Sequence, residues 1–341
     1  MPVADAYASM RALWHALSEH ETGASPGSIW DTYESGERRL LERRLAETYG
    51  APAATAVCTG MTGVMNALMA ASLAVGGALE EPRYCGHYEI LDLFEGVLGR
   101  LGSRAEVGVR VVEPVTNDPT LRVHTHALGE PASAVVIDNS LFSISLPWEV
   151  WSSRSSSPLL VVESIPKFLC REANGGVIFG EEDLVAAVRD LSRRTGTLMS
   201  RAASTAVLGA SIELAADRVR QHAANAELFA EALARRRPDL EVRIPHQVAR
   251  SAGLEGACSS LVFLIYPPGA SVLEQFEAWA GRAERLLGRP MVRHGYGWTK
   301  TYGRAYGPNK LNAPAGTEYI RFSVGLEPPD VLAELAELMT A

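Results

Sequence analysis

An aspartate and a lysine each follow a short apolar run in this chain, and together they supply the side chains that chemistry on amino groups requires. Asp138 ends the run 135–138, and Lys167 follows the run 161–163. Apolar runs rich in β-branched residues predict buried strands, and open α/β sheets bind ligands at the carboxyl ends of their strands. A lysine amine forms a Schiff base with the aldehyde of pyridoxal phosphate, while a carboxylate keeps the pyridine nitrogen protonated so that the ring accepts electrons. The two residues therefore predict a pyridoxal phosphate site.

Each of these residues also has an ordinary structural explanation. An aspartate at the end of a strand often caps a helix, and a lysine after a strand is usually a solvated surface charge. The pair alone does not decide between these explanations and a cofactor site, so the interpretation depends on further motifs along the chain.

Further segments carry residues that can bind a cofactor or an amino acid. They are, in chain order, Tyr33 in 31–36, Gly60 and Met61 in 58–64, Tyr84 in 84–88, Asn117 in 113–121 and Arg321 in 319–327. With the segments around Asp138 and Lys167, they resemble the Cys/Met-metabolism family of pyridoxal phosphate enzymes, the cystathionine synthase and lyase group. The resemblance runs from about Tyr33 to the end of the chain. Each motif is weak by itself, and the specificity lies in their fixed order.

The resemblance implies a role for each of the predicted cofactor-binding residues. The backbone N–H groups of Gly60 and Met61 would bind the cofactor phosphate where a helix begins. Tyr84 would stack on the pyridine face, and Asn117 would bind the phenolic oxygen. Ser164 would be the side-chain hydroxyl donor of the lysine segment.

The resemblance also implies how the substrate is held and how the protein assembles. Arg321 would bind the α-carboxylate of an amino acid as a bidentate fork. With Lys167 and Tyr84 it completes the predicted catalytic set. Tyr33 would be donated across a subunit boundary to the cofactor site, so we expect a homo-oligomer, either a dimer or a tetramer.

The chain departs from the family pattern at several places. Glu34-Ser35 follow Tyr33 where the family has a phosphate-binding arginine, which Arg38 or Arg39 would have to replace. Pro166 replaces a hydroxyl residue. The substrate loop 293–301 is aromatic and basic, which suits either a bulky or anionic substrate or an interface loop. In that loop His294 is either an acid–base group or, as for most single histidines, a structural residue.

The resemblance implies an enzyme that removes the α-proton of an amino acid and then eliminates or replaces a group at the β- or γ-carbon. Two alternatives remain open. One is another pyridoxal phosphate reaction on the same scaffold, either amino transfer or carbon–carbon bond formation, as in specialised metabolism. The other is a non-catalytic relative.

Composition excludes several other classes of protein. The 341 residues are 47% hydrophobic and 21% charged, with a formal net charge of -8, so we expect a compact protein that binds neither nucleic acid nor an anionic membrane. The four cysteines lack metal-site spacing, and no metal is expected. Cys85 and Cys170 lie near the predicted site, but small buried thiols usually serve packing. The chain shows no secretory signal and no membrane-spanning run, so we expect it in the cytoplasm.

The apolar pattern predicts a two-domain α/β protein of pyridoxal phosphate fold type I. Runs at 55–58, 109–112, 134–138, 159–163 and 176–179 alternate with helical stretches such as 61–74, which predicts a mostly parallel, seven-stranded sheet. Beyond about residue 212 the pattern changes to a long helix, a strand at 261–266, a helix at 273–287 and a terminal strand and helix. The expected units are an N-terminal arm (1–40), a large cofactor domain (41–212) and a smaller α+β domain (213–341).

Overall fold

The computed structural model describes residues 36–75, 80, 108–292, 296–307 and 316–339. Its larger sheet has five strands, in the order β1-β5-β4-β3-β2. The strands are β1 (Ala53–Val57), β2 (Val109–Val112), β3 (Ala134–Asp138), β4 (Leu159–Ser164) and β5 (Gly176–Gly180). Strands β2, β3 and β4 pair in parallel, and β5 pairs antiparallel with both β4 and β1. Four of the five strands therefore point in one direction.

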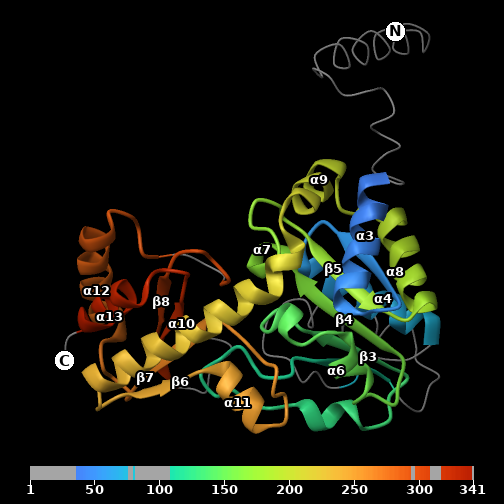
Figure 1. Ribbon diagram of the computed structural model, residues 1–341. Coiled ribbons are helices and arrows are strands. Elements are labelled where there is room, and N and C mark those ends of the chain that lie inside the picture. The colour runs from blue at the N-terminus through green and yellow to red at the C-terminus, as the bar shows by residue number, and fades with distance from the viewer. Residues whose placement is uncertain (1–35, 76–79, 81–107, 293–295, 308–315, 340–341) are drawn as a thin grey trace, which may run out of the picture.

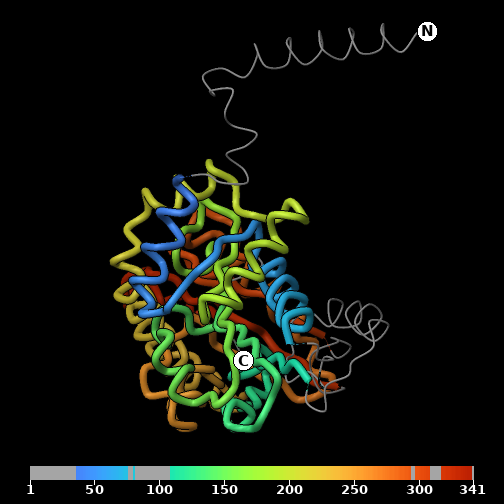
Figure 2. The backbone as a smooth tube through the Cα atoms, turned by 90° about the vertical axis from the view of Figure 1, so that its right-hand side faces the viewer, coloured from blue at the N-terminus to red at the C-terminus, as the bar shows by residue number. Residues whose placement is uncertain are grey.

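Both faces of this sheet are covered, which explains why its strands are short continuous apolar runs. Helix α3 (Gly36–Tyr49) packs on one face through Leu41, Leu45 and Tyr49. Helices α4 (Gly60–Val75) and α8 (Glu182–Arg194) pack on the other face. Figure 2 shows α3 and α4 on opposite sides of the sheet. The carboxyl ends of β2, β3 and β4 are left for short segments and loops.

The longest of the described helices, α10 (Ala215–Arg236), runs from the larger sheet to a second, smaller sheet (Figure 1). Its first half packs with the core of the larger sheet through Val219 and Ala223, and its second half packs with the smaller sheet through Phe229 and Leu233. The smaller sheet is antiparallel throughout, in the order β6-β7-β9-β8.

The smaller sheet carries helices on one face and turns the other toward the larger sheet. Its strands are β6 (Glu241–Arg243), β7 (Leu261–Tyr266), β8 (Tyr302–Tyr306) and β9 (Glu318–Ser323). Helices α12 (Val272–Leu287) and α13 (Pro329–Glu337) share a core with Val262, Leu264 and Phe322. On the other face Phe263 and Tyr319 belong to the core of the larger sheet. The side chains of that face therefore lie where the two sheets meet.

The remaining described helices are short connectors. They are α6 (Trp148–Ser152), α7 (Ile165–Phe168), α9 (Arg201–Gly209) and α11 (Pro245–Ser251), with 3-10 turns at Thr125–Leu128, Ser143–Ser145 and Ile212–Leu214. Among the described helices, none combines the length and apolar character needed to cross a bilayer.

The sequence predicted most of these elements but not all of their directions. The predicted mostly parallel sheet is confirmed, with the correction that β5 runs against its neighbours. The described residues supply five of the seven strands expected. Strands β6 and β8 were not predicted, because the first is only three residues long and the second lacks an apolar run. The predicted domain boundaries at residues 40 and 212 stay predictions.

Candidate active site

Residues from three adjacent parallel strands meet at one edge of the larger sheet. Glu113 follows β2, Asp138 ends β3, and Ser164 ends β4. Lys167 lies in α7, which begins directly after β4. Because the register aligns β2 with β3 and β3 with β4, these residues project from the same edge. Asp138 and Lys167 thus lie at the same edge of the sheet, and Asp138 influences the pKa of the lysine.

The side chain of Lys167 contacts an aromatic residue from a distant loop. Its Nζ atom donates a hydrogen bond to the Tyr296 hydroxyl at 2.6 Å and lies 4.2 Å from the centre of that ring. Burial lowers the pKa of the Lys167 ammonium from its usual value, and the Asp138 and Glu113 carboxylates oppose this shift. A lysine with a lowered pKa holds more of its amine in the neutral form, which is the form that acts as nucleophile and base.

The lysine helix is held by α10 and by the loop that carries Tyr296. Arg218 of α10 donates to the carbonyl oxygens of Phe168 and Leu169 at 2.8 and 3.0 Å, at the carboxyl end of α7. Gly297, with φ of +75°, lies so close that a Cβ atom there would be 1.8 Å from the Lys167 carbonyl oxygen. The loop that carries Tyr296 is therefore packed directly on the backbone of Lys167.

Arg321 reaches the same site from β9. Its strand places it on the face of the smaller sheet that meets the larger one, beside Phe263 of β7. The Arg321 guanidinium further lowers the pKa of Lys167, after burial and against the two carboxylates. Arg321 therefore lies within electrostatic reach of Lys167.

The start of α4 provides a cradle next to β4. A Cβ atom on Gly60 would lie 2.8 Å from the Cβ of Ser164 and 3.0 Å from its Oγ. The backbone of Gly60 therefore lies too close to Ser164 for a residue with a side chain. The Thr59 hydroxyl caps the helix by accepting from the Thr62 N–H at 2.9 Å. The N–H groups of Gly60 and Met61 precede that bond and point out of the helix start, where an anion is favoured.

Asn117 carries a buried atom that lacks a partner within the described residues. Its Oδ1 is enclosed without a hydrogen bond, although the residue as a whole is half-buried. A buried amide without a partner costs free energy. The predicted bond from Asn117 to a phenolic oxygen would use the Nδ2–H donor of the same amide, so Oδ1 needs a donor from elsewhere.

A second buried network lies behind the lysine. The Glu163 carboxylate accepts hydrogen bonds from the Tyr49 hydroxyl at 2.6 Å, the Ser143 hydroxyl at 2.9 Å and the Asn139 amide at 2.8 Å. Burial raises the pKa of Glu163 to about 8, although these donors act in the opposite direction. The network ties α3 to the end of β4, one residue before Ser164.

Some predicted site residues cannot be placed. Tyr33, Tyr84 and His294 lie outside the described residues. Of the two arginines considered as phosphate ligands, Arg38 is buried in its own chain, where it donates to the Met199 carbonyl and pairs with Glu42, which disfavours that role. Arg39 is exposed, and it too pairs with Glu42.

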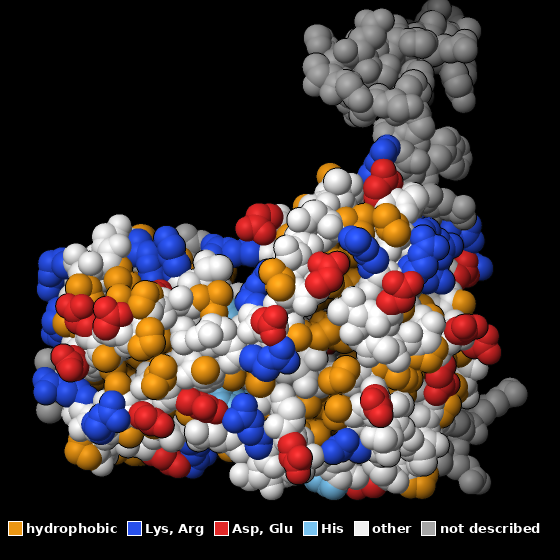
Figure 3. Space-filling view, in the orientation of Figure 1, with side chains coloured by type: hydrophobic (Ala, Val, Ile, Leu, Met, Phe, Trp, Pro, Cys, Tyr) orange, Lys and Arg blue, Asp and Glu red, His pale blue; other side chains and the backbone are white. Residues whose placement is uncertain are grey.

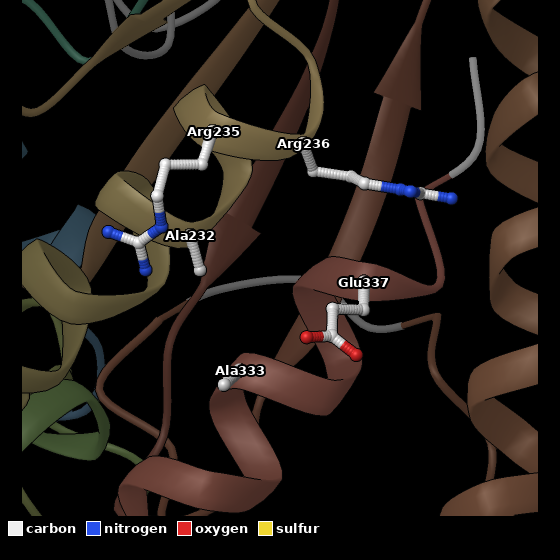
Figure 4. Close-up of a pocket in the computed structure, with 5 residues that line it drawn as sticks. All are labelled: Ala232, Arg235, Arg236, Ala333 and Glu337. Atoms are coloured by element: carbon white, nitrogen blue, oxygen red, sulfur yellow. The ribbon is translucent and has the colours of Figure 1, made fainter.

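One hollow elsewhere on the described surface is lined partly by arginines but does not present them to a common ligand. This cavity of about 350 Å³ lies between α10 and α13 and is lined by Ala232, Arg235, Arg236, Ala333 and Glu337. Its two guanidinium groups point in different directions rather than toward a common centre (Figure 4). Over the face shown in Figure 3, basic and acidic side chains are interspersed rather than segregated. Among the described residues, no group of three or more His, Cys, Asp and Glu could hold a metal ion.

Sequence reasoning missed Tyr296 as a contact of the lysine. The sequence shows an aromatic loop at this point, but 129 residues separate Tyr296 from Lys167, and only the packing of Gly297 on α7 reveals that they touch. Glu113 was seen within a motif but was given no role.

Comparison with solved structures identifies the fold. The apo structure of a methionine gamma lyase from Micromonospora echinospora matches with a TM-score of 0.70 and 21% sequence identity, over 90% of this chain and 87% of that one. A cystathionine gamma synthase from Xanthomonas oryzae pv. oryzae, in complex with aminoacrylate and cysteine, matches with a TM-score of 0.68 and 17% identity, over 90% and 87% of the two chains. No protein-family model matches this chain, and no curated protein sequence matches it. The predicted fold, type I of the pyridoxal phosphate enzymes, is confirmed.

Proposed function

We propose that this protein is a pyridoxal phosphate-dependent enzyme that acts on an amino acid by elimination or replacement at the β- or γ-carbon. The observation that carries the proposal is the placement of Lys167 at the carboxyl end of β4, with a lowered pKa and within the electrostatic reach of Asp138 and Arg321. The likeness in fold to a methionine gamma lyase and a cystathionine gamma synthase supports this reaction class.

The residues of the site fit the proposed cofactor. Asp138 would hold the proton on the pyridine nitrogen, Lys167 would bind the aldehyde, and Asn117 would bond the phenolic oxygen. Gly60 and Met61 would hold the phosphate at the start of α4, with the Ser164 hydroxyl beside them. When bound, the cofactor supplies an electron sink for the charge left when the α-proton departs.

The chain's own residues then have separate tasks in the proposed reaction. Arg321 binds the α-carboxylate and so orients the Cα–H bond toward Lys167. The Lys167 amine takes the α-proton, and burial favours the neutral form that this step requires by lowering the pKa of the amine. Tyr296, whose hydroxyl contacts Nζ, helps to hold the lysine in place.

Replacement of Lys167 by alanine tests the proposal. The chain has three lysines, Lys167, Lys300 and Lys310, so the lysine that binds the aldehyde can be found without ambiguity. We expect borohydride reduction of the loaded protein to fix the cofactor on Lys167 alone, as read by mass spectrometry. The Lys167→Ala variant should lose this modification, and its turnover should fall by about a thousandfold or more.

Lys300→Ala is the matched control and should retain both properties. Modification of Lys300 instead of Lys167, or undiminished turnover of Lys167→Ala, would contradict the assignment. Release of a keto acid and ammonia supports elimination, whereas accumulation of pyridoxamine phosphate would indicate amino transfer instead.

We also propose that the protein is a homo-oligomer located in the cytoplasm. The homo-oligomer follows from the resemblance, which assigns Tyr33 to a neighbouring subunit's site. Light scattering should give a multiple of the 36.7 kDa chain mass, and a monomer would contradict this proposal.

A further inference from the structure

A second arginine lies directly beside the proposed carboxylate-binding residue. Arg304 of β8 is opposite Arg321 of β9 in the antiparallel pairing of these two strands. Residues in opposed positions project from the same face of a sheet. Both side chains are half-buried and lie on the face that meets the larger sheet. The site therefore presents two guanidinium groups side by side.

An aromatic residue supports both groups. The central carbons of the Arg304 and Arg321 guanidiniums lie 5.2 and 5.5 Å from the centre of the Tyr306 ring. That ring is stacked on Tyr319, with the ring centres 4.7 Å apart and the planes at 19°. Cation–π contacts with a buried, stacked ring restrict where the guanidiniums can go, which lowers the entropic cost of binding an anion.

The two arginines lie on neighbouring strands of the smaller sheet. Arg304 belongs to β8, which is last in the order β6-β7-β9-β8, and Arg321 belongs to β9, between β8 and β7. Opposed residues of an antiparallel pair have Cα atoms about 5 Å apart. An extended chain of about four carbon–carbon bonds, as in a small amino acid substrate, has a similar length.

We infer that Arg304 binds a second anionic group, at the end of the substrate's side chain, so that the substrate class is amino acids with an acidic side chain. The α-carboxylate occupies Arg321 and the distal anion occupies Arg304. A guanidinium fork binds carboxylate and phosphate equally well in geometry. The class therefore includes amino acids whose side chain ends in either group. The inference rests on the proposed function, because it assumes that Arg321 holds the α-carboxylate.

Glutamate and glutamine form a suitable probe pair, because they have the same shape and differ in the charge at the distal end. Their dissociation constants can be measured on the cofactor-loaded protein from the change in cofactor absorbance, without turnover. We expect glutamate to bind about tenfold or more tightly than glutamine, because hydrogen bonds between charged groups are the stronger ones. O-phosphoserine, measured alongside, tells whether Arg304 prefers phosphate or carboxylate.

Variants separate the distal site from the α-carboxylate site. Arg304→Gln should bring the ratio of the two dissociation constants to about one, and Arg304→Lys should retain part of the preference. Arg321→Gln should weaken both amino acids together. Arg235→Gln, on the exposed side of α10, should keep the wild-type ratio.

The outcomes that overturn the inference are distinct from those that overturn the proposed function. A loaded wild-type protein that binds both amino acids equally, or an Arg304→Gln variant with the wild-type ratio, contradicts the distal site alone. A wild-type protein that takes up no pyridoxal phosphate contradicts the proposed function, and the distal site with it.

Discussion

At the scale of single residues, the chemistry of this site depends on how the protein controls one amine. Lys167 is buried, which favours its neutral form, yet two carboxylates and a phenol lie around it. Desolvation outweighs the carboxylates, so the pKa falls. The Tyr296 hydroxyl accepts a hydrogen bond from Nζ and so stabilises the charged form of the lysine.

Tyr296→Phe tests the role of that hydroxyl. The variant keeps the ring over Lys167 but loses the acceptor, so the charged amine loses a hydrogen bond. We expect the pKa of Lys167 to fall by about one unit, since a bond to a charged group contributes about 1.5 kcal/mol or more. The measurement is the pH dependence of Lys167 acylation by an amine-selective reagent in cofactor-free protein.

Lys300, which is exposed, serves as an internal control in the same digest. An identical pH profile for Lys167 in the two proteins would show that the hydroxyl does not influence the amine.

At the scale of secondary structure, the proposed phosphate cradle at the start of α4 requires α4, β4 and β5 to approach one another closely. Gly176, the first residue of β5, permits this approach: a Cβ atom there would lie 2.5 Å from the Thr59 carbonyl oxygen and 2.7 Å from the Cα of Gly60. Both neighbours are backbone atoms that cannot rotate away. The start of α4 is therefore positioned by a glycine that lies over 100 residues further along the chain.

Gly176→Ala should therefore destabilise the protein and weaken cofactor binding. We expect a loss of about 1–3 kcal/mol in the free energy of unfolding, the usual cost of overpacking. Gly281→Ala is the matched control, because Gly281 lies inside α12 with only the Arg285 side chain near its Cβ position, at 3.8 Å. It should stabilise by about 0.5–1 kcal/mol. Urea denaturation measures both, and equal effects would refute the steric argument.

At the scale of the whole molecule, the buried Glu163 network couples stability to pH. Burial raises the pKa of Glu163 to about 8 in the folded protein, above its ordinary value of 4.5. Between these values the unfolded chain releases the proton while the folded chain keeps it. The stabilising contribution is complete below the lower value and disappears as pH rises through the upper one.

Glu163→Gln should remove this dependence, because an amide does not titrate but can still accept hydrogen bonds from Tyr49 and Ser143. We expect the wild type to lose stability relative to the variant as pH rises across that window, by at most about 1.4 kcal/mol per pH unit. Denaturation at several pH values measures the difference. The Glu277→Gln variant, changed at an exposed position of α12, should show the same pH dependence of stability as the wild type. If the stability of all three proteins changes with pH in the same way, Glu163 is ionised in the folded state.

The sequence by itself determined most of the elements and suggested the residues of the site. The runs at 134–138 and 261–266 coincide with β3 and β7, because a strand buried on both faces must be apolar along its whole length. Asp138 and Lys167 were expected at one site because each follows an apolar run, and Arg321 because of the family resemblance; their roles stay predictions.

Only the tertiary structure decided the contacts that join distant segments. The direction of β5, the contact of Tyr296 with Lys167 and the pairing of Arg304 with Arg321 depend on how separate elements pack, and no local pattern records them. Periodicity tells which face of an element is buried, because burial is a local requirement on side chains. It does not tell which partner covers that face, because the partner is chosen by the packing of the whole chain.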